Sequence, residues 1–381
     1  MKPETIRQGI PCLQNAIYLN SGSLGPTLRV VVEAEQAVLA EQLRTGGAAP
    51  SLYQHFGEIN QSCRVAVAQA IGATADEIAL TQSTSDGIGA VAAGIAWQAG
   101  DEVITSDLEH ISGLLPWRVV ADRYGVQIVN LQGHDGYLSV DDFATAITER
   151  TRLICISHVA WNSGALLPVA EVCALAQERG IMVVVDGAQS AGQLQIDVRK
   201  LGCHFYSLPG HKWMMGPLGT GALYVRQDMI SQLNTSRVGW ASAAHDEENN
   251  FTLHASARRY EAGTIHSPAY AGWQAALEYV ASIGSEQVFA RILHLAQVAR
   301  DIFHQVPGCE VLGPTNSAYW SGLLALRFAD RDPKMLAEQL WQEKRIITRW
   351  IPQPYAFRLS LHAFVTEQEL EQVAGAISKS Q

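Results

Sequence analysis

The chain has no apolar run long enough to cross a bilayer and no excess of basic residues. None of the apolar stretches in its 381 residues reaches the roughly 18 positions that a transmembrane helix needs. The first ten residues, MKPETIRQGI, lack the apolar core of a signal peptide. The 27 Lys and Arg against 37 Asp and Glu give a formal net charge of -10, which argues against a nucleic-acid partner or an anionic membrane surface. We therefore expect a cytoplasmic protein without a nucleic-acid or membrane partner.

The sequence also lacks a cysteine framework. It contains no CxxC pair and no His/Cys spacing typical of a metal site. Its six cysteines are scattered, at Cys12, Cys63, Cys155, Cys173, Cys203 and Cys309. We expect them to be small buried side chains and predict no metal site.

What the sequence does contain is a long alternation of apolar runs with amphipathic stretches. Strands are expected over 78–81, 102–106, 126–131, 152–157, 181–186, 204–207 and 221–225, with helical periodicity between them, as in 170–179. This alternation predicts an α/β fold with a mainly parallel seven-stranded sheet covered by helices on both faces. A hydrophobic content of 48% and a length of 381 residues fit a globular protein with two domains.

The pattern changes after about residue 268. Long helices are expected from 268 to about 303, followed by strands over 323–328, 346–349 and 357–361 and helices over 334–343 and 367–377. We therefore expect a large domain over 16–268 and a smaller α+β domain formed by 1–15 and 269–381.

An acid at a strand end and a lysine in a glycine-bounded loop give the first indication of chemistry. Asp186 follows the apolar run IMVVV, and Lys212 comes 26 positions later in the segment SLPGHKW. Parallel sheets place their chemistry at the carboxyl ends of strands. Taken alone, Lys212 fits an ordinary solvated loop lysine. Together, the two residues are what a pyridoxal phosphate (PLP) enzyme needs: a carboxylate for the pyridinium nitrogen and a lysine for the Schiff base.

A phosphate site is expected where the strand over 78–81 gives way to a helix. The segment TQSTSDG places hydroxyls beside the backbone N–H groups of a helix start, and Thr84 and Ser85 fit this place. A helix N-cap alone accounts for one of these hydroxyls.

Four motifs in order, VDGAQSAG, GHKW, GPLGTG and EAGT, resemble the class V aminotransferase family of fold-type I PLP enzymes. This family includes cysteine desulfurases, cystine C–S lyases, kynureninase and isopenicillin N epimerase-like proteins. The resemblance runs from Tyr18 to Arg358 and implies the fold-type I architecture. It implies three catalytic residues, with Lys212 as the Schiff-base lysine, Asp186 on the pyridine nitrogen and His110 stacked on the ring.

Further cofactor contacts are implied by the same resemblance. Gln189 is expected to reach the phenolic oxygen, and Asn162 that oxygen or the substrate, although an Asx turn explains Asn162 equally well. Thr264 matches a threonine that reaches the phosphate of the neighbouring subunit, which implies a homodimer with shared active sites.

One position departs from the family pattern. Pro209 stands where the family has Ser or Thr, so either Ser207 and His211 compensate or phosphate binding is weaker.

Substrate contacts are expected from both ends of the chain. Arg358 matches the arginine that grips the substrate α-carboxylate, and Arg349 lies nine residues before it, a pairing that resembles the cystine lyases. Asn20, in the N-terminal segment where the resemblance begins, is also expected to bind substrate. Singly, each arginine fits a surface position.

The choice between a desulfurase and a lyase depends on whether the C-terminal domain has a cysteine that can accept sulfur. Family desulfurases take sulfur onto a cysteine of the C-terminal domain, but segments 316–322 and 346–361 contain none, and Cys309 fits a structural role at a strand start. The sequence therefore predicts a C–S lyase that removes a thiol or persulfide from cystine, cysteine or an S-substituted cysteine by β-elimination, with a sulfur acceptor as a possible partner.

Three other functions stay open on the sequence. They are an aminotransferase or epimerase on the same scaffold, a desulfurase-like sulfur donor without the usual cysteine, and a PLP-carrying regulatory protein without turnover. Tyr53, His55 and Trp240 fit a pocket, the core or a dimer contact equally well.

Overall fold

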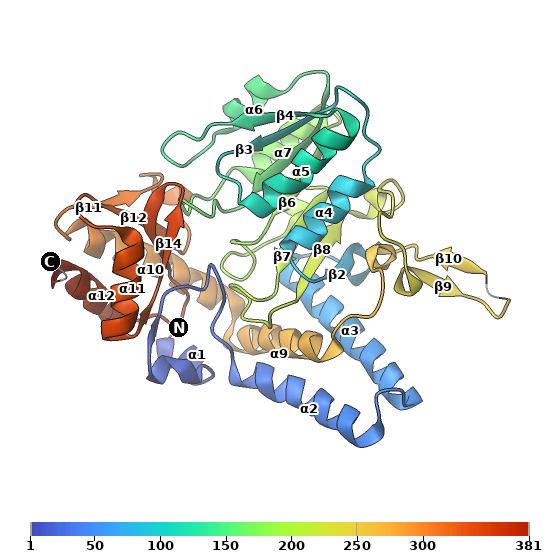
Figure 1. Cartoon of the computed structure of the whole chain (residues 1–381), viewed down its shortest axis with the longest axis horizontal. Helices are drawn as coiled ribbons and strands as arrows, with labels where there is room; N and C mark the ends of the chain where they lie inside the picture. Colours follow the sequence, from blue (N-terminus) through green and yellow to red (C-terminus); the bar gives the residue numbers. More distant parts are fainter. Residues whose placement is uncertain (1, 249, 380–381) are drawn as a thin grey trace.

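A computed structural model describes residues 2–248 and 250–379 of the chain (Figure 1). Its centre is a seven-stranded sheet in which β8 runs antiparallel to both neighbours and the other adjacent strands are parallel. In sheet order the strands are β2 (Ile78–Thr81), β8 (Gly221–Val225), β7 (Phe205–Pro209), β6 (Met182–Asp186), β5 (Thr151–Ser157), β3 (Glu102–Ser106) and β4 (Gln127–Leu131). Most residues of these strands are buried, because helices cover both faces of the sheet, whereas β4 at the edge is only partly buried.

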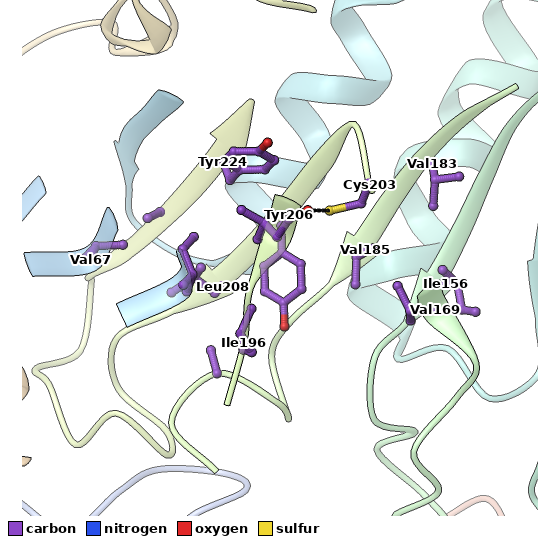
Figure 2. Close-up of a cluster of buried hydrophobic side chains, with 14 of the residues drawn as sticks. Val67, Ile156, Val169, Val183, Val185, Ile196, Cys203, Tyr206, Leu208 and Tyr224 are labelled. Carbon is purple, nitrogen blue, oxygen red and sulfur yellow. Dashed lines mark hydrogen bonds between the residues drawn. The ribbon is translucent and has the colours of Figure 1, made fainter. Parts of the chain in front are cut away.

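The two faces of the sheet carry separate helix layers. Alternate strand residues on one face pack against α3 (Pro50–Ile71), α6 (Val140–Ala146), α7 (Val169–Glu178) and α9 (Ser267–Ile283). Figure 2 shows part of this layer, with Val67 of α3 and Val169 of α7 in the same cluster as Val183, Val185 and Tyr206 of the sheet. The opposite face packs against α4 (Thr84–Gly94) and α5 (Ile111–Tyr124).

The predicted fold class is confirmed. The expected strands over 78–81, 102–106 and 221–225 have the observed bounds, and the other four differ by two residues or fewer at each end. The long helical stretch after residue 268 is two helices, α9 and α10 (Ser285–His304), separated by Gly284 with a φ of 99°. Glycine tolerates this backbone angle because it has no Cβ.

A second, four-stranded antiparallel sheet stands beside the first at the left of Figure 1, in the order β11 (Cys309–Leu312), β12 (Leu323–Phe328), β15 (Tyr355–Ser360) and β14 (Arg349–Pro352). Helices α10, α11 (Pro333–Lys344) and α12 (Glu367–Lys379) contribute to its core. The single strand expected over 346–349 is wrong: β13 (Ile346–Ile347) pairs with β1 (Ile17–Tyr18), while Arg349 begins β14. The chain changes partner at Thr348, which sequence periodicity does not reveal.

The predicted division at residue 268 stays a prediction. The second core gathers N-terminal side chains such as Ile6 and Leu19 with the C-terminal segments, as the division implies. Helix α9 serves both cores, however, since Trp273 belongs to the first and Ala276 to the second.

Two projecting elements were not expected from the sequence. Helix α2 (Arg29–Thr45) packs along α9, and its far end projects with the start of α3 at the lower right of Figure 1. The hairpin of β9 (Ala243–His245) and β10 (Phe251–Leu253) projects at the right. Within residues 2–248 and 250–379, no helix is long and apolar enough to cross a membrane, and no cluster of His, Cys, Asp or Glu could hold a metal ion.

Candidate active site

The carboxyl edge of the large sheet surrounds a cavity of about 270 Å³. Segments after β2, β3, β5, β6 and β7 line it, as parallel sheets favour, and the N-terminal segment and the small sheet close it. Nine of the thirteen predicted site residues line this cavity: Thr84, Ser85, His110, Asp186, Gln189, His211, Lys212, Arg349 and Arg358. The other four are Asn20, Asn162, Ser207 and Thr264, which lie outside the lining.

Asp186, at the end of β6, and Lys212, in the loop after the adjacent strand β7, line the same cavity. Asp186 ends β6, is 4% exposed, and its Oδ1 accepts a hydrogen bond of 2.8 Å from the Ala188 backbone N–H. Burial raises the pKa of Asp186, while that hydrogen bond and the Lys212 cation act against the rise. Burial lowers the pKa of Lys212 to about 8, with Asp186 opposing this shift and Arg358 and Arg349 adding to it. The lysine can therefore shed its proton near neutral pH, as a nucleophile and base must.

His110 presents a neutral ring at one wall of the cavity. Its side chain caps α5 by accepting a hydrogen bond of 3.3 Å from the Ser112 backbone N–H, and its ring meets Trp161 edge-on with centroids 5.2 Å apart. Burial and then the nearby cations Lys212, Arg349 and Arg358 together lower the pKa of His110 to about 4. A neutral imidazole fixed in this way can stack on a flat ring.

The start of α4 forms one end of the cavity and has the groups that can bind an anion. Ser83 is the N-cap, accepting a hydrogen bond from Asp86, and Thr84 and Ser85 form the first turn. The N–H groups of a helix start point toward its N-terminal side and bind phosphate well. Ser83 also lines the cavity and was not predicted, although it is the first hydroxyl of the STS run and an N-cap residue type.

The region of Pro209 clarifies which residues can compensate for the missing hydroxyl. Ser207 Oγ donates a hydrogen bond of 2.9 Å to the Thr84 carbonyl oxygen, so it braces the start of α4 from behind the cavity. His211 lines the cavity, its Nδ1 is buried without a hydrogen-bond partner, and burial lowers its pKa to about 4. Besides the predicted Thr84 and Ser85, His211 and Ser83 are thus the polar side chains at this end that can compensate for the hydroxyl missing at Pro209.

The opposite end of the cavity holds two arginines joined by Ser23. Arg358 is 2% exposed; it donates from Nη1 to the Trp161 carbonyl oxygen at 2.9 Å and from Nη2 to Ser23 Oγ at 3.1 Å, and its Nε has no partner. Arg349, its partner in the β14–β15 register, also donates to Ser23 Oγ at 3.1 Å. Asn20 lies behind them and accepts a hydrogen bond of 2.7 Å from Ser23. Burial, followed by Arg349, lowers the pKa of Arg358 to about 9, so an anion between the two is favoured.

Three predicted residues have other surroundings. Gln189 lines the cavity, but its amide donates to the Gly22 carbonyl oxygen and accepts from Trp213, each at 2.9 Å. Asn162 is 5% exposed, its Oδ1 has no partner, and it lines a neighbouring cavity. Thr264 is exposed on the surface of its own chain.

Glu109 is a buried acid beside the site that sequence reasoning missed. Its oxygens accept hydrogen bonds from the Ser157 backbone N–H at 2.6 Å and the Ser157 hydroxyl at 2.7 Å. Ser157 is the register partner of Asp186. Burial and then the Asp186 charge raise the pKa of Glu109 to about 8. The sequence places Glu109 directly before His110, but its burial depends on the strands around it.

These groups fit pyridoxal phosphate. The helix start can hold a phosphate, Asp186 can face a ring nitrogen, His110 can stack, and Lys212 can bond the aldehyde carbon. The unpartnered His211 Nδ1 and Arg358 Nε are buried donors or acceptors that a bound molecule can satisfy.

Comparison with known proteins gives consistent matches along the chain. The profile of the family described as aminotransferase class-V matches residues 17–373. A probable cysteine desulfurase from Methanothermobacter thermautotrophicus is 31% identical over 92% of this chain and 87% of its own. The cystine C–S lyase C-DES, solved with its reaction product cysteine persulfide, superposes with a TM-score of 0.93 at 28% identity over 97% of this chain and 99% of that one. A C-DES variant with glycine covalently linked to the PLP cofactor gives a TM-score of 0.94 at 28% identity, covering 98% and 99% of the two chains.

Proposed function

Because the chain belongs to the class V aminotransferase family, we propose that it is a C–S lyase acting by direct β-elimination on cystine, cysteine or an S-substituted cysteine. The predicted family, the fold-type I architecture and PLP as the cofactor are confirmed, and the enzyme cleaves carbon–sulfur bonds. The substrate and its leaving group are the parts that we propose.

The cofactor and the substrate are held at different ends of the cavity. The start of α4, with Thr84 and Ser85, holds the cofactor phosphate, and Asp186 keeps the proton on the ring nitrogen. Arg358 and Arg349 bind the substrate α-carboxylate, and their fork geometry orients the amino acid between Lys212 and His110.

Lys212 is the base in this scheme. When bound, PLP would supply an electron sink for the negative charge that develops at Cα of the substrate. Lys212 Nζ takes the Cα proton, and its lowered pKa of about 8 makes the neutral amine accessible at physiological pH. The Cβ–S bond then breaks with its electron pair on sulfur, and water converts the unsaturated amino acid to pyruvate and ammonia.

The positions of the six cysteines support direct elimination over transfer of the substrate sulfur to a cysteine of the enzyme. Each of the six cysteines is described, and none contributes to the lining of the 270 Å³ cavity. Burial raises the pKa of Cys309 to about 11 and of Cys173 to about 12, and it also raises the pKa of Cys12, Cys63, Cys155 and Cys203. A protonated thiol outside the cavity is a poor acceptor for substrate sulfur, so sulfur leaves with the product.

The test is pyruvate release from L-cystine and from L-cysteine by the PLP-loaded enzyme and by Lys212→Ala. We expect pyruvate from the wild type and at least a 1,000-fold lower rate from the variant, because both nucleophile and base are lost. The matched control is Lys200→Ala, which should keep full activity. Lys200 is exposed on the short helix α8 (Val198–Leu201), where it pairs with the N-cap residue Asp197. A pyridoxamine spectrum without pyruvate would contradict the lyase and favour an aminotransferase, and a persulfide on Cys309 would favour a desulfurase.

We further infer a homodimer with shared sites. Thr264 is exposed and outside the cavity of its own chain, while exposed apolar side chains stand near it and on the projecting elements, including Trp240 at 64%, Phe251 at 67% and Leu43 at 89%. Such a surface suits burial against a second copy. The six free thiols fit the reducing cytoplasm, and a released persulfide would need a sulfur acceptor as partner.

A further inference from the structure

A second cavity of about 660 Å³ adjoins the active site behind His110 and Trp161. It shares His110, Trp161 and Arg349 with the first cavity, so the two spaces have a common wall. Its floor is formed by β3 and β4 and its side by α5, through residues such as Ile128 and Leu114. We call this space the α5 groove.

The volumes of the two cavities bear on which part of a substrate each of them can hold. Pockets that hold drug-sized ligands measure about 300–1,000 Å³, and the active-site cavity of 270 Å³ falls just below this range. We expect the cofactor and one small amino acid to occupy this cavity, so a long substituent on the substrate sulfur needs a further space. The α5 groove, at 660 Å³, is the larger adjoining space.

We propose that the α5 groove binds the distal half of a cystine-type disulfide substrate, with Arg118 receiving the distal carboxylate and Asp107 the distal ammonium. This inference rests on the proposed function and names the substrate class of the same site. Both residues line the groove, and Arg118 forms no ion pair among the described residues. A zwitterionic group matches a surface that offers one charge of each sign.

Helix geometry supports the placement of Arg118. Side chains on an α-helix lean toward its N-terminus, and α5 begins at Ile111, directly after His110. Arg118 therefore leans back along the groove toward the active site. Leu114, one turn nearer, covers the stretch that the disulfide would occupy.

A buried hydroxyl gives independent support for a ligand in the groove. Thr105 is 1% exposed, its Oγ1 has no hydrogen-bond partner, and it lines the groove from β3. Buried hydroxyls are nearly always paired in folded proteins. Glu109 also lines the groove, but both of its oxygens accept hydrogen bonds from Ser157. Asp107 Oδ1 accepts a hydrogen bond of 2.9 Å from the Gly133 backbone N–H, so its Oδ2 is the oxygen that we assign to the ammonium.

The test measures binding rather than turnover. L,L-Diaminosuberate, in which methylenes replace both sulfurs of cystine, is titrated calorimetrically into the PLP-loaded enzyme, with L-alanine as a probe too short for the groove. We expect Leu114→Trp to weaken diaminosuberate binding about tenfold or more by filling the groove. Arg118→Gln should weaken it about two- to fivefold, as expected for an exposed ion pair. Neither variant should change alanine binding.

Matched variants on the same helix complete the design. Leu115→Trp and Arg123→Gln alter residues of α5 that do not line the groove, and they should bind both probes like the wild type. The proposal is overturned if Arg118→Gln and Leu114→Trp leave diaminosuberate binding unchanged, or if they weaken both probes equally. If cystine gives no pyruvate but the selective binding losses appear, the proposed elimination fails while the groove assignment stands.

Discussion

The two cavity-facing arginines repel each other, and Ser23 is the side chain that they share. Its hydroxyl oxygen accepts from both at 3.1 Å and its proton goes to Asn20 at 2.7 Å, so its lone pairs point to the cations. This oxygen gives both guanidinium groups a common hydrogen-bond acceptor where they line the cavity. Ser23 is therefore a positioning residue for substrate binding.

We expect Ser23→Ala to raise the KM for cystine about 10- to 150-fold with kcat changed by less than about threefold, since hydrogen bonds to charged groups contribute about 1.5–3 kcal/mol. The measurement is steady-state pyruvate release, with the cofactor absorbance as a check that PLP binding is intact. Ser282→Ala, at an exposed serine of α9 that does not line the cavity, is the matched control. Equal losses in kcat and kcat/KM would contradict a role limited to substrate binding.

Glu109 predicts a pH-dependent stability of the cofactor-free chain. Its pKa is about 8 in the folded protein, against about 4.3 in an unfolded chain. Between these values the folded state retains a proton that the unfolded state gives up, so this residue lowers stability progressively as pH rises from about 4.3 to 8. Glutamine has nearly the same shape as a protonated glutamic acid but has no carboxyl group that can ionise.

Glu109→Gln should therefore raise Tm little at pH 5 and by about 2 °C or more at pH 8, relative to the wild type at each pH. Differential scanning calorimetry of the PLP-free protein measures this. The exposed Glu149→Gln is the control and should show no such pH-dependent gain. A gain that is larger at pH 5 than at pH 8 would refute the assignment of a buried neutral acid.

Site residues can be predicted from the sequence when the residues next to them in the chain reveal their role. Asp186 follows a buried strand and Lys212 stands in a glycine-bounded loop, so both were predictable. Ser23 was not, because its role depends on Arg349 and Arg358 more than 320 positions away. Thr105 and Glu109 are likewise defined by burial between strands and helices rather than by neighbours in the chain.

Among the elements, the strands were easier to predict than the helices that brace them. Short runs rich in apolar residues located β2, β3 and β8 at their observed bounds, since strands buried on both faces need apolar side chains on both sides. The mixed sequences of α2 and α3 gave no comparable signal, because these helices are stabilised by packing on α9.

The segment that carries Thr264 is anchored by a buried ion pair. Arg64 of α3 and Glu261 lie 2.5 Å apart at 4% and 7% side-chain exposure, and Glu261 also accepts from the Leu80 backbone N–H of β2 at 2.8 Å. Removing one partner leaves the other charge buried without compensation.

Glu261→Gln should therefore lower the free energy of unfolding by about 3–5 kcal/mol in urea titrations. The double variant Arg64→Met/Glu261→Gln should lose less than the sum of the two single losses, because neither charge is left alone. Arg237→Met, which breaks the more exposed ion pair with Asp86, is the control and should cost about 1 kcal/mol or less. Additive losses in the double variant would contradict a direct Arg64–Glu261 coupling.

At the scale of the whole molecule, the site is formed where separate parts of the chain meet. The large sheet supplies Asp186 and Lys212, the small sheet supplies Arg349 and Arg358, and residues 22–23 close the cavity between them. A Cβ on Gly25 would collide with the Lys212 carbonyl oxygen, so the N-terminal segment packs directly on the lysine loop. In the homodimer that we propose, a second copy would add its own contribution at the phosphate end of the cavity.

Mixing two inactive variants tests whether that contribution is Thr264 of a second copy. Lys212→Ala and Thr264→Ala are each expected to be strongly impaired at limiting PLP. In a heterodimer with shared sites, the Thr264→Ala chain keeps its own Lys212 and receives an intact threonine from its partner. Random exchange makes half of the dimers heterodimers, so activity should recover to about one quarter of the wild-type value. If Thr264 acts within its own chain, no intact site forms and mixing restores nothing; Lys212→Ala mixed with Lys212→Met provides the zero level.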